Sequence, residues 1–192
     1  EPGIPSITVD DRHAAQIAMT HLLEYGHRNI AIVILEDSRP PEQEEYSGIG
    51  RVRMQGYDDA LRRYGMTCED RRVVRLDEPC TIEGGLLAAQ EIVAEHRDVT
   101  GIVAMSDVIA LGLYEGLRSA GLRIPDDVSI VGFDDILEAQ LVTPALTTVH
   151  QPAEEKGRRA GELLVRMIRN EAVEDRVRFT CSLIERGSVG PV

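Results

Sequence analysis

The apolar residues of this chain fall into two patterns that alternate along its length. Short, continuous apolar runs predict strands that are covered on both faces of a sheet. Between them, apolar residues recur every three or four positions, which predicts amphipathic helices. The expected strands are residues 7–9, 30–35, 73–76, 101–105, 128–133, 146–149 and 178–184, and the expected helices are residues 11–25, 51–64, 82–96, 107–120 and 152–169.

Glycines mark the ends of three of these helices. Gly26, Gly65 and Gly121 each follow a helix and lead back toward a strand, because glycine adopts the left-handed conformation that ends a helix at little cost. Strands and helices of these lengths in alternation indicate a parallel sheet with right-handed crossovers. The sequence therefore predicts an α/β fold with a doubly wound, mainly parallel sheet. After Asp135 the rhythm changes to a brief strand, one long helix and a last strand.

The charge of the chain limits what this stretch of sequence binds. Its 192 residues include 21 Lys and Arg against 33 Asp and Glu, which gives a net charge of −12. A surface that acidic repels a phosphate backbone, so DNA binding is expected only from another part of a longer chain. The sequence also starts almost directly on a strand, which suggests a piece of something longer.

The cysteines and the hydropathy of the chain indicate the compartment in which the protein works. Cys68, Cys80 and Cys181 are far apart and odd in number, which fits neither a disulfide framework nor a zinc site and favours a reducing compartment. No apolar run is long enough to span a membrane. We therefore expect a cytoplasmic protein without a membrane segment.

The sequence motifs of common enzymes are mostly missing. Gly48-Ile49-Gly50 begins like a dinucleotide-binding fingerprint, but the third glycine position holds Arg53 and a polar loop precedes the motif. No metal-ligand spacing links the five histidines, which are His13, His21, His27, His96 and His150. We expect neither a metal nor a cofactor, and no catalytic residues.

Polar side chains follow three of the expected strands on their carboxyl sides. They are Arg53 after the strand at 30–35, Ser106 and Asp107 after the strand at 101–105, and Asp134 after the strand at 128–133. Because ligands bind outside the carboxyl ends of parallel strands, these side chains are expected to face one site. Carboxylates and Arg hold hydroxyl groups through charge-assisted hydrogen bonds, which suits a polar or polyhydroxylated ligand.

Each of these residues also has a purely structural interpretation. Either Ser106 or Asp107 could cap the helix that follows them, and Asp107 could have only this role. Arg53 could be a solvated surface residue, and Asp134 with Asp135 could form only a turn. No pair of nucleophile and base is evident among them, so binding is favoured over catalysis.

Six motifs follow one another along nearly the whole chain. The longest runs from Gly121 to Asp135 and reads Gly-Leu-Arg-Ile-Pro-Asp-Asp-Val-Ser-Ile-Val-Gly-Phe-Asp-Asp. The other five are Leu22–Ile32, Arg53–Tyr57, Ser106–Gly112, Pro144–Val149 with Gln151-Pro152, and Leu183–Ser188. Each alone would be a weak signal. Taken together and in this order, they resemble the LacI/GalR family of bacterial transcription regulators.

The resemblance implies a periplasmic-binding-protein-like fold with two subdomains and a ligand cleft between them. It implies that residues 1–9 are a remnant of the first subdomain and a crossover, and that residues 10–149 are the second, effector-binding subdomain. Residues 150–176 would be a helix that belongs to the first subdomain, and residues 177–192 a return strand to the second subdomain and a tail. The family's helix-turn-helix headpiece and most of the first subdomain are expected to precede Glu1. The apolar stripe of the helix at 152–169 then needs another cover, for which we expect a second chain.

The resemblance also assigns roles at the site. Arg53 and Asp134 match the family's effector-contacting Arg and Asp, and Ser106 matches a polar contact position beside them. Pro79 lies where some relatives place an aromatic residue over the effector ring, and this chain has no Trp and only two Phe. Asp107 is then expected to cap its helix, and Asp135 to serve the turn that follows.

The function implied by the resemblance is effector sensing and dimerisation in a DNA-binding transcription regulator that responds to a small polar ligand such as a sugar or nucleoside. Operator DNA would be bound only through the headpiece. A homodimer would form through faces near the helices at 82–96 and 107–120 and the segment after Asp135. The alternative is a periplasmic sugar-binding protein of a transport system, which shares the fold. We expect no enzyme, and we expect this half of the cleft to bind effector poorly on its own.

Overall fold

The computed structural model describes residues 5–35, 48–76 and 80–192, and eight strands and five α-helices lie within these ranges. The strands are β1 (Ser6–Val9), β2 (Ile30–Leu35), β3 (Arg71–Leu76), β4 (Gly101–Ala104), β5 (Ser129–Asp134), β6 (Thr147–His150), β7 (Arg176–Phe179) and β8 (Ser182–Ile184). The α-helices are α1 (Asp11–Glu24), α2 (Ile49–Arg63), α3 (Ile82–Glu95), α4 (Asp107–Ser119) and α5 (Ala153–Ile168). Two short 3-10 helices are η2 (Cys68–Asp70) and η3 (Leu137–Gln140).

Six of the strands form one sheet in the order β3-β2-β4-β5-β6-β8. The first five strands run parallel, and β8 pairs antiparallel with β6 at the edge. Nearly every side chain of β2, β4 and β5 is buried, as expected for strands covered on both faces. The expected doubly wound, mainly parallel sheet is therefore confirmed.

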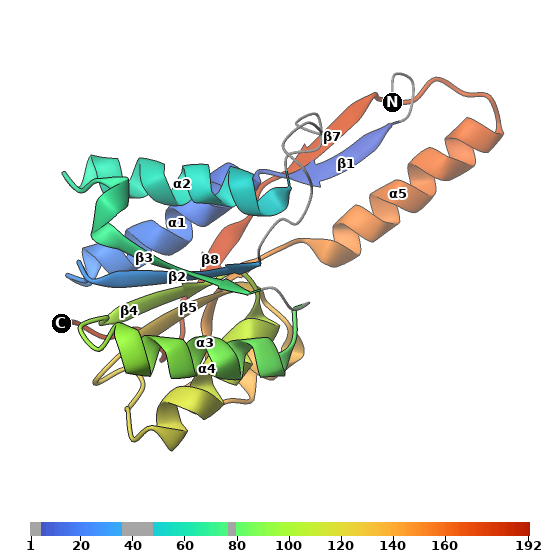
Figure 1. Ribbon diagram of the computed structural model, residues 1–192. Coiled ribbons are helices and arrows are strands. Elements are labelled where there is room, and N and C mark those ends of the chain that lie inside the picture. Colours follow the sequence, from blue (N-terminus) through green and yellow to red (C-terminus); the bar gives the residue numbers. More distant parts are fainter. Residues whose placement is uncertain (1–4, 36–47, 77–79) are drawn as a thin grey trace.

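Helices cover both faces of this sheet, with α1 and α2 on one side and α3 and α4 on the other (Figure 1). Both pairs pack closely at glycines. A Cβ atom at Gly56 would lie 2.1 Å from the carbonyl oxygen of Arg12 in α1, and one at Gly112 would lie 2.1 Å from that of Ile82 in α3. An apolar core fills the space on each side of the sheet, and Phe133 is one of the largest fully buried side chains.

The carboxyl-terminal tail packs against the end of the main sheet at which its parallel strands begin. The fully buried Ser188 donates its hydroxyl to the carbonyl of Ile130 and accepts from the N–H of Thr147. The carbonyl of Gly190 accepts from Nε2 of His27 at 3.0 Å, and burial lowers the pKa of this histidine. The tail thereby joins β5 and β6 to the turn after α1.

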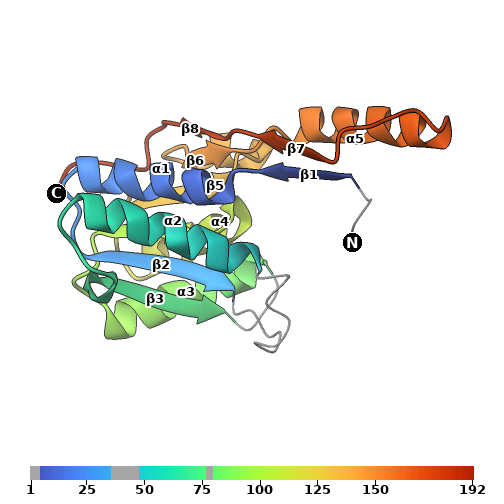
Figure 2. The ribbon, with the colours of Figure 1, turned by 90° about the horizontal axis from the view of Figure 1, so that it is seen from above.

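A second, smaller unit consists of β1, β7 and α5. β1 and β7 form a two-stranded parallel sheet that α5 contacts, and the unit extends away from the carboxyl edge of the main sheet (Figures 1 and 2). The chain passes between the two parts after β1, after β6 and after β7. The single strand expected at residues 178–184 is wrong. Thr180 and Cys181 separate two strands, because the segment pairs first with β1 and then with β6.

The helix α5 carries an apolar face that the described chain covers only in part. Leu163 is 3% exposed, whereas Leu164 is 58% and Ile168 is 73% exposed. Parallel strands are normally covered on both faces, so the unit of β1, β7 and α5 is incompletely packed. The division of the chain between two subdomains stays a prediction.

Candidate functional site

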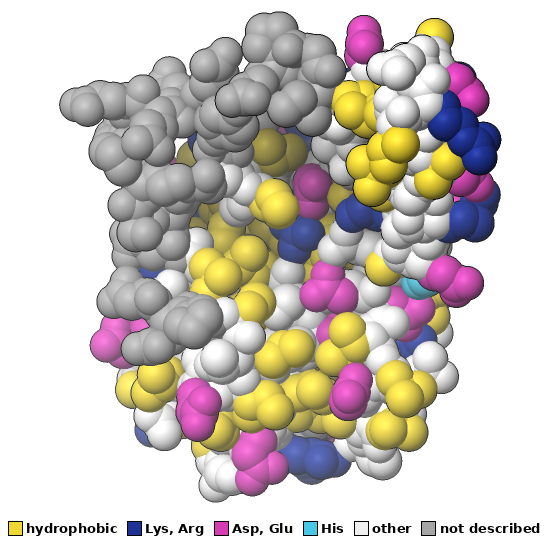
Figure 3. Space-filling view, turned by 90° about the vertical axis from the view of Figure 1, so that its right-hand side faces the viewer, with side chains coloured by type: hydrophobic (Ala, Val, Ile, Leu, Met, Phe, Trp, Pro, Cys, Tyr) yellow, Lys and Arg dark blue, Asp and Glu magenta, His cyan; other side chains and the backbone are white. Residues whose placement is uncertain are grey.

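The five parallel strands of the main sheet end on the same side, which we call its carboxyl edge. A hollow with basic and acidic side chains inside it lies there (Figure 3). Arg53 lies in the second turn of α2, and Asp134 is the last residue of β5. Arg53 stacks on the ring of Phe133, the residue directly before Asp134, and its positive charge acts on the carboxyl group of Asp134. The fold brings these two expected contacts together, and their role in ligand binding stays a prediction.

Arg53 is fixed by three protein contacts and is only 5% exposed. Its Nε and Nη2 each lie 3.0 Å from Oδ1 of Asp11, and its Nη1 donates to the carbonyl of Met105 at 2.6 Å. The guanidinium carbon lies 3.4 Å from the centroid of the Phe133 ring. The bonds to Asp11 and Met105 engage three of the five N–H groups of the guanidinium, which leaves two for a ligand. Arg53 is therefore not the solvated surface residue that the sequence also allowed.

Asp134 forms one wall of an open pocket with a volume of about 480 Å³. The pocket is lined by Asp134, Asp135, Ile136, His150, Gln151, Ala153 and Glu154. Nε2 of Gln151 donates to Oδ1 of Asp134 at 2.6 Å. Burial raises the pKa of Asp134 to about 6, although the bond from Gln151 and the charge of Arg53 act in the opposite direction. At neutral pH this carboxyl group is mainly ionised and accepts hydrogen bonds.

The backbone at Asp134 and Asp135 is strained, with φ angles of 129° and 62° in residues that are not glycine. Such conformations cost about 1–3 kcal/mol each and persist only where the surrounding structure supports them. The buried Asp107 gives this support. Its Oδ2 accepts from the N–H of Ile136 at 3.0 Å, and its Oδ1 accepts from the hydroxyl of Thr148 at 2.6 Å. Asp107 therefore fixes the turn that presents Asp134.

The expectation that Asp107 caps α4 is wrong. Ser106 is the N-cap residue, and its hydroxyl oxygen accepts from the N–H of Ile109 at 3.3 Å. Asp107 points toward the sheet instead, where a Cβ atom at Gly132 would lie 2.2 Å from its Oδ1. Burial raises the pKa of Asp107, and its hydrogen bonds counteract that rise. A glycine in a buried strand, here Gly132, was the sequence signal for this close approach.

The other two expected contacts remain predictions. The buried hydroxyl of Ser106 caps α4 and also lies 3.0 Å from Sγ of the exposed Cys80. Pro79 lies outside the described residues.

Asp135 does more than serve the turn. Its Oδ1 accepts from Nη2 of Arg186 at 2.5 Å, and its Oδ2 lies 2.9 Å from Nδ1 of His150. Arg186 also donates to the carbonyl of Leu146. These bonds tie the end of β5 to β6 and to the segment after β8. The sequence interpretation missed these partners, and it missed Gln151 as a partner of Asp134 although Gln151 stands in one of the six motifs.

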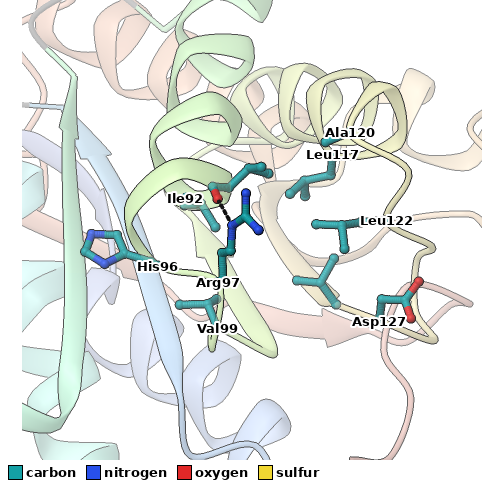
Figure 4. Close-up of a pocket in the computed structure, with 10 residues that line it drawn as sticks. Ile92, His96, Arg97, Val99, Leu117, Ala120, Leu122 and Asp127 are labelled. Carbon is teal, nitrogen blue, oxygen red and sulfur yellow. Dashed lines mark hydrogen bonds between the residues drawn. The ribbon is translucent and has the colours of Figure 1, made fainter.

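A second pocket, with a volume of about 280 Å³, lies at the opposite edge of the sheet (Figure 4). It is bounded by the C-terminal ends of α3 and α4 and by residues that precede β4 and β5. Arg97 projects across it and donates from Nε to the carbonyl of Val93 at 3.0 Å. Arg53, Ser106 and Asp134 do not line this pocket, so it is separate from the hollow at the carboxyl edge.

Within residues 5–35, 48–76 and 80–192, no group of three or more His, Cys, Asp or Glu side chains is placed to hold a metal ion. No helix in them is both long and apolar enough to cross a membrane.

Comparison with known proteins agrees with the geometry. Residues 19–189 match the model of the periplasmic binding protein-like domain. The structure superposes on a LacI family transcriptional regulator from Enterococcus faecium, solved with bound ribose, with a TM-score of 0.89 and 31% identity, over 100% of this chain and 68% of that chain. This chain belongs to the LacI family. The resemblance of the six motifs and the periplasmic-binding-protein-like fold are thus confirmed.

Two repressors of Escherichia coli strain K12 are also similar to this LacI-family chain. The transcriptional repressor CytR is 35% identical over 189 residues, which cover 98% of this chain and 52% of the repressor. The ribose operon repressor is 31% identical over 173 residues, which cover 90% of this chain and 49% of that protein. The chain therefore spans about half the length of the curated relatives it matches.

Proposed function

We propose that this chain is the effector-sensing and dimerisation portion of a bacterial DNA-binding transcription regulator that responds to a small polar ligand such as a sugar or nucleoside. The placement of Arg53 and Asp134 in one polar hollow of a LacI-family fold carries the proposal. Arg53 offers two N–H donors, and Asp134 offers carboxylate oxygens. Hydroxyl groups both donate and accept, so they suit this combination.

The path of the chain supports a link between ligand binding and a change of shape. Gln151 lies in the connection from β6 to α5, and it bonds Asp134 in the hollow. A ligand that contacts Asp134 therefore acts next to a segment that joins the two parts of the molecule. We propose that the ligand binds one relative orientation of the parts more tightly and so shifts their equilibrium. Operator DNA would be bound through a headpiece elsewhere in the protein.

Exposed apolar residues support the proposed homodimer. Hydrophobic side chains gather on the lower part of the face shown in Figure 3. Two exposed apolar residues lie in α3, namely Ile82 and Leu87. Two more are Leu137 in η3 and Leu141 directly after η3. These elements lie where the family resemblance places the dimer faces, and apolar patches of this kind typically mark protein interfaces.

The remaining expectations belong to the same proposal. The relatives are named as transcriptional repressors or regulators, which favours a regulator over the periplasmic transport protein and over an enzyme. A cytoplasmic location follows from that role. Residues 1–9 and 150–176 are proposed as parts of the first subdomain, and residues 10–149 and 177–192 as the second.

Nuclear magnetic resonance titration of the isotopically labelled 192-residue chain tests the proposal. Ribose or a nucleoside should shift the amide signals around Arg53 and Asp134, with millimolar affinity because only one side of the cleft is engaged. Asp134→Ala should remove these shifts, whereas the matched variant Asp126→Ala, on the exposed turn before β5, should keep them. Shifts that survive Asp134→Ala, or that map to the pocket at Arg97, would contradict the site.

A further inference from the structure

Two arginines beside the hollow already face carboxylates of the protein. Arg53 lies 3.0 Å from Asp11, and Arg186 lies 2.5 Å from Asp135. All four side chains are largely removed from water, so each pair interacts strongly over this short distance. Neither arginine therefore offers an uncompensated positive charge to a ligand.

Two carboxylates, those of Asp134 and Glu154, line the open pocket at the carboxyl edge and form no ion pair with an arginine in the described residues. Asp134 accepts a hydrogen bond from the amide of Gln151, and Arg53, whose positive charge acts on it, is already paired with Asp11. Glu154 is exposed in the first turn of α5, and none of the ion pairs in the described parts of the chain includes it. The wall of the pocket thus carries an excess of negative charge.

We infer that this site takes an uncharged polyhydroxylated compound, such as a free sugar or nucleoside, and rejects the phosphorylated form of the same compound. The inference rests on the proposed function and adds the charge of the ligand to it. A hydroxyl group donates to Asp134 and accepts from the two remaining N–H groups of Arg53. A phosphate group accepts only and carries about −1.5 to −2 charges at pH 7, so Asp134 and Glu154 repel it.

The expected discrimination is moderate because the pocket is open to water. Between two charges near a protein surface the effective dielectric constant is about 20 or more, so we expect the phosphorylated ligand to bind on the order of tenfold more weakly. Salt provides a test of the cause. At about 1 M NaCl the screening length falls to about 3 Å, and discrimination by charge shrinks, whereas discrimination by shape does not.

The experiment titrates the 192-residue chain with two matched pairs of probes, ribose with ribose 5-phosphate and adenosine with adenosine 5′-monophosphate. Amide shifts in the hollow report the dissociation constant of each probe. We expect tighter binding of the uncharged member of each pair, and a smaller difference in high salt. Glu154→Lys should also narrow the difference, and Glu154→Gln, which keeps the shape of the side chain, should narrow it less. Glu95→Lys makes the same change of charge at the C-terminal end of α3, at the opposite edge, and should leave the difference intact.

The outcomes separate this inference from the proposed function. If the phosphorylated probes bind as well as the uncharged ones, the inference is overturned and the proposed function stands. The inference is also overturned if the phosphate is held at the start of α2, a helix without an acidic residue in its first turn. A difference that resists both salt and Glu154→Lys would assign the discrimination to shape and overturn the role of charge. If no probe of either pair shifts the hollow, the proposed function fails and the inference fails with it.

Discussion

The two parts of the molecule differ in how completely they bury their apolar residues. In the main sheet, helix pairs cover both faces of β2, β4 and β5, and Phe133 is fully buried. In the unit of β1, β7 and α5, Leu163 is the one buried residue of the helix, while Leu164 and Ile168 are exposed. The main sheet and its helices therefore hold their structure through their own contacts. The smaller unit leaves much of the apolar face of α5 exposed within the described residues.

The largest effect is expected from Phe133→Ala. This change removes a fully buried ring from β5 and the surface on which Arg53 stacks, so it should lower the free energy of unfolding by about 4 kcal/mol. Urea unfolding measures the loss. The matched change Ile168→Ala, on the exposed face of α5, should cost less than about 0.5 kcal/mol. Similar losses of unfolding free energy in the two variants would contradict the difference in packing between the main sheet and α5.

Asp107→Ala should come next, with a loss of about 3 kcal/mol. It leaves the hydroxyl of Thr148 and the N–H of Ile136 without their buried acceptor and releases the strained turn. Asp107→Asn keeps one oxygen acceptor and should cost about half as much. Thermal unfolding of both variants provides the measurement. If Asp107→Ala were neutral, the turn would have to be held by Asp135 and its partners alone.

Asp134→Asn should raise the free energy of unfolding at neutral and alkaline pH but not at acidic pH. Burial raises the pKa of Asp134 in the folded protein to about 6, above its value of about 3.9 in the unfolded chain. The folded state therefore binds the proton more tightly, and the contribution of this group to stability falls as the pH rises from about 4 to about 6. At about pH 8 the variant should gain about 2 kcal/mol, and at about pH 4 almost nothing.

Urea unfolding at the two pH values measures this gain. Asp135→Asn is the control, because that carboxylate is paired with Arg186 and its neutralisation should destabilise the protein at about pH 8. A gain from Asp134→Asn that is equal at both pH values would show that the carboxyl group is not buried in its ionised form.

The smallest effect on unfolding is expected from the double change Leu164→Ser and Ile168→Ser, less than about 0.5 kcal/mol, because both side chains are exposed. Its effect on association should be larger if a second chain covers this face of α5, as the apolar stripe predicts. Sedimentation equilibrium of the original chain and of the variant makes the comparison. An original chain that stays monomeric at high concentration would contradict docking on α5.

The regular part of the fold could be predicted from the sequence because it rests on local patterns. Continuous apolar runs gave β2 and β5, and helical periodicity with a following glycine gave α1 and α2. The end of the chain could not be predicted in the same way. Residues 178–184 contain no turn signal, and only their partners in space, β1 and β6, divide them into two strands.

The candidate site was predictable in position but not in its internal bonding. Arg53 and Asp134 follow strands of a parallel sheet, so their shared edge follows from topology. The pairing of Arg53 with Asp11 joins residues 42 positions apart, and the bond from Thr148 to Asp107 joins residues 41 positions apart. Such contacts depend on how the elements pack, and a single sequence carries no pattern that reveals them.

The carboxyl-terminal tail has a consequence for work with this protein in the laboratory. Shortening the chain after Arg186 would remove both bonds of Ser188, take away the acceptor at Gly190 and leave the ring of His27 open to water. Even the last residue takes part, because the N–H of Val192 bonds the carbonyl of Tyr25. An affinity tag, fluorescent label or fusion partner attached directly after Val192 would therefore lie beside these bonds and should be separated from them by a flexible linker.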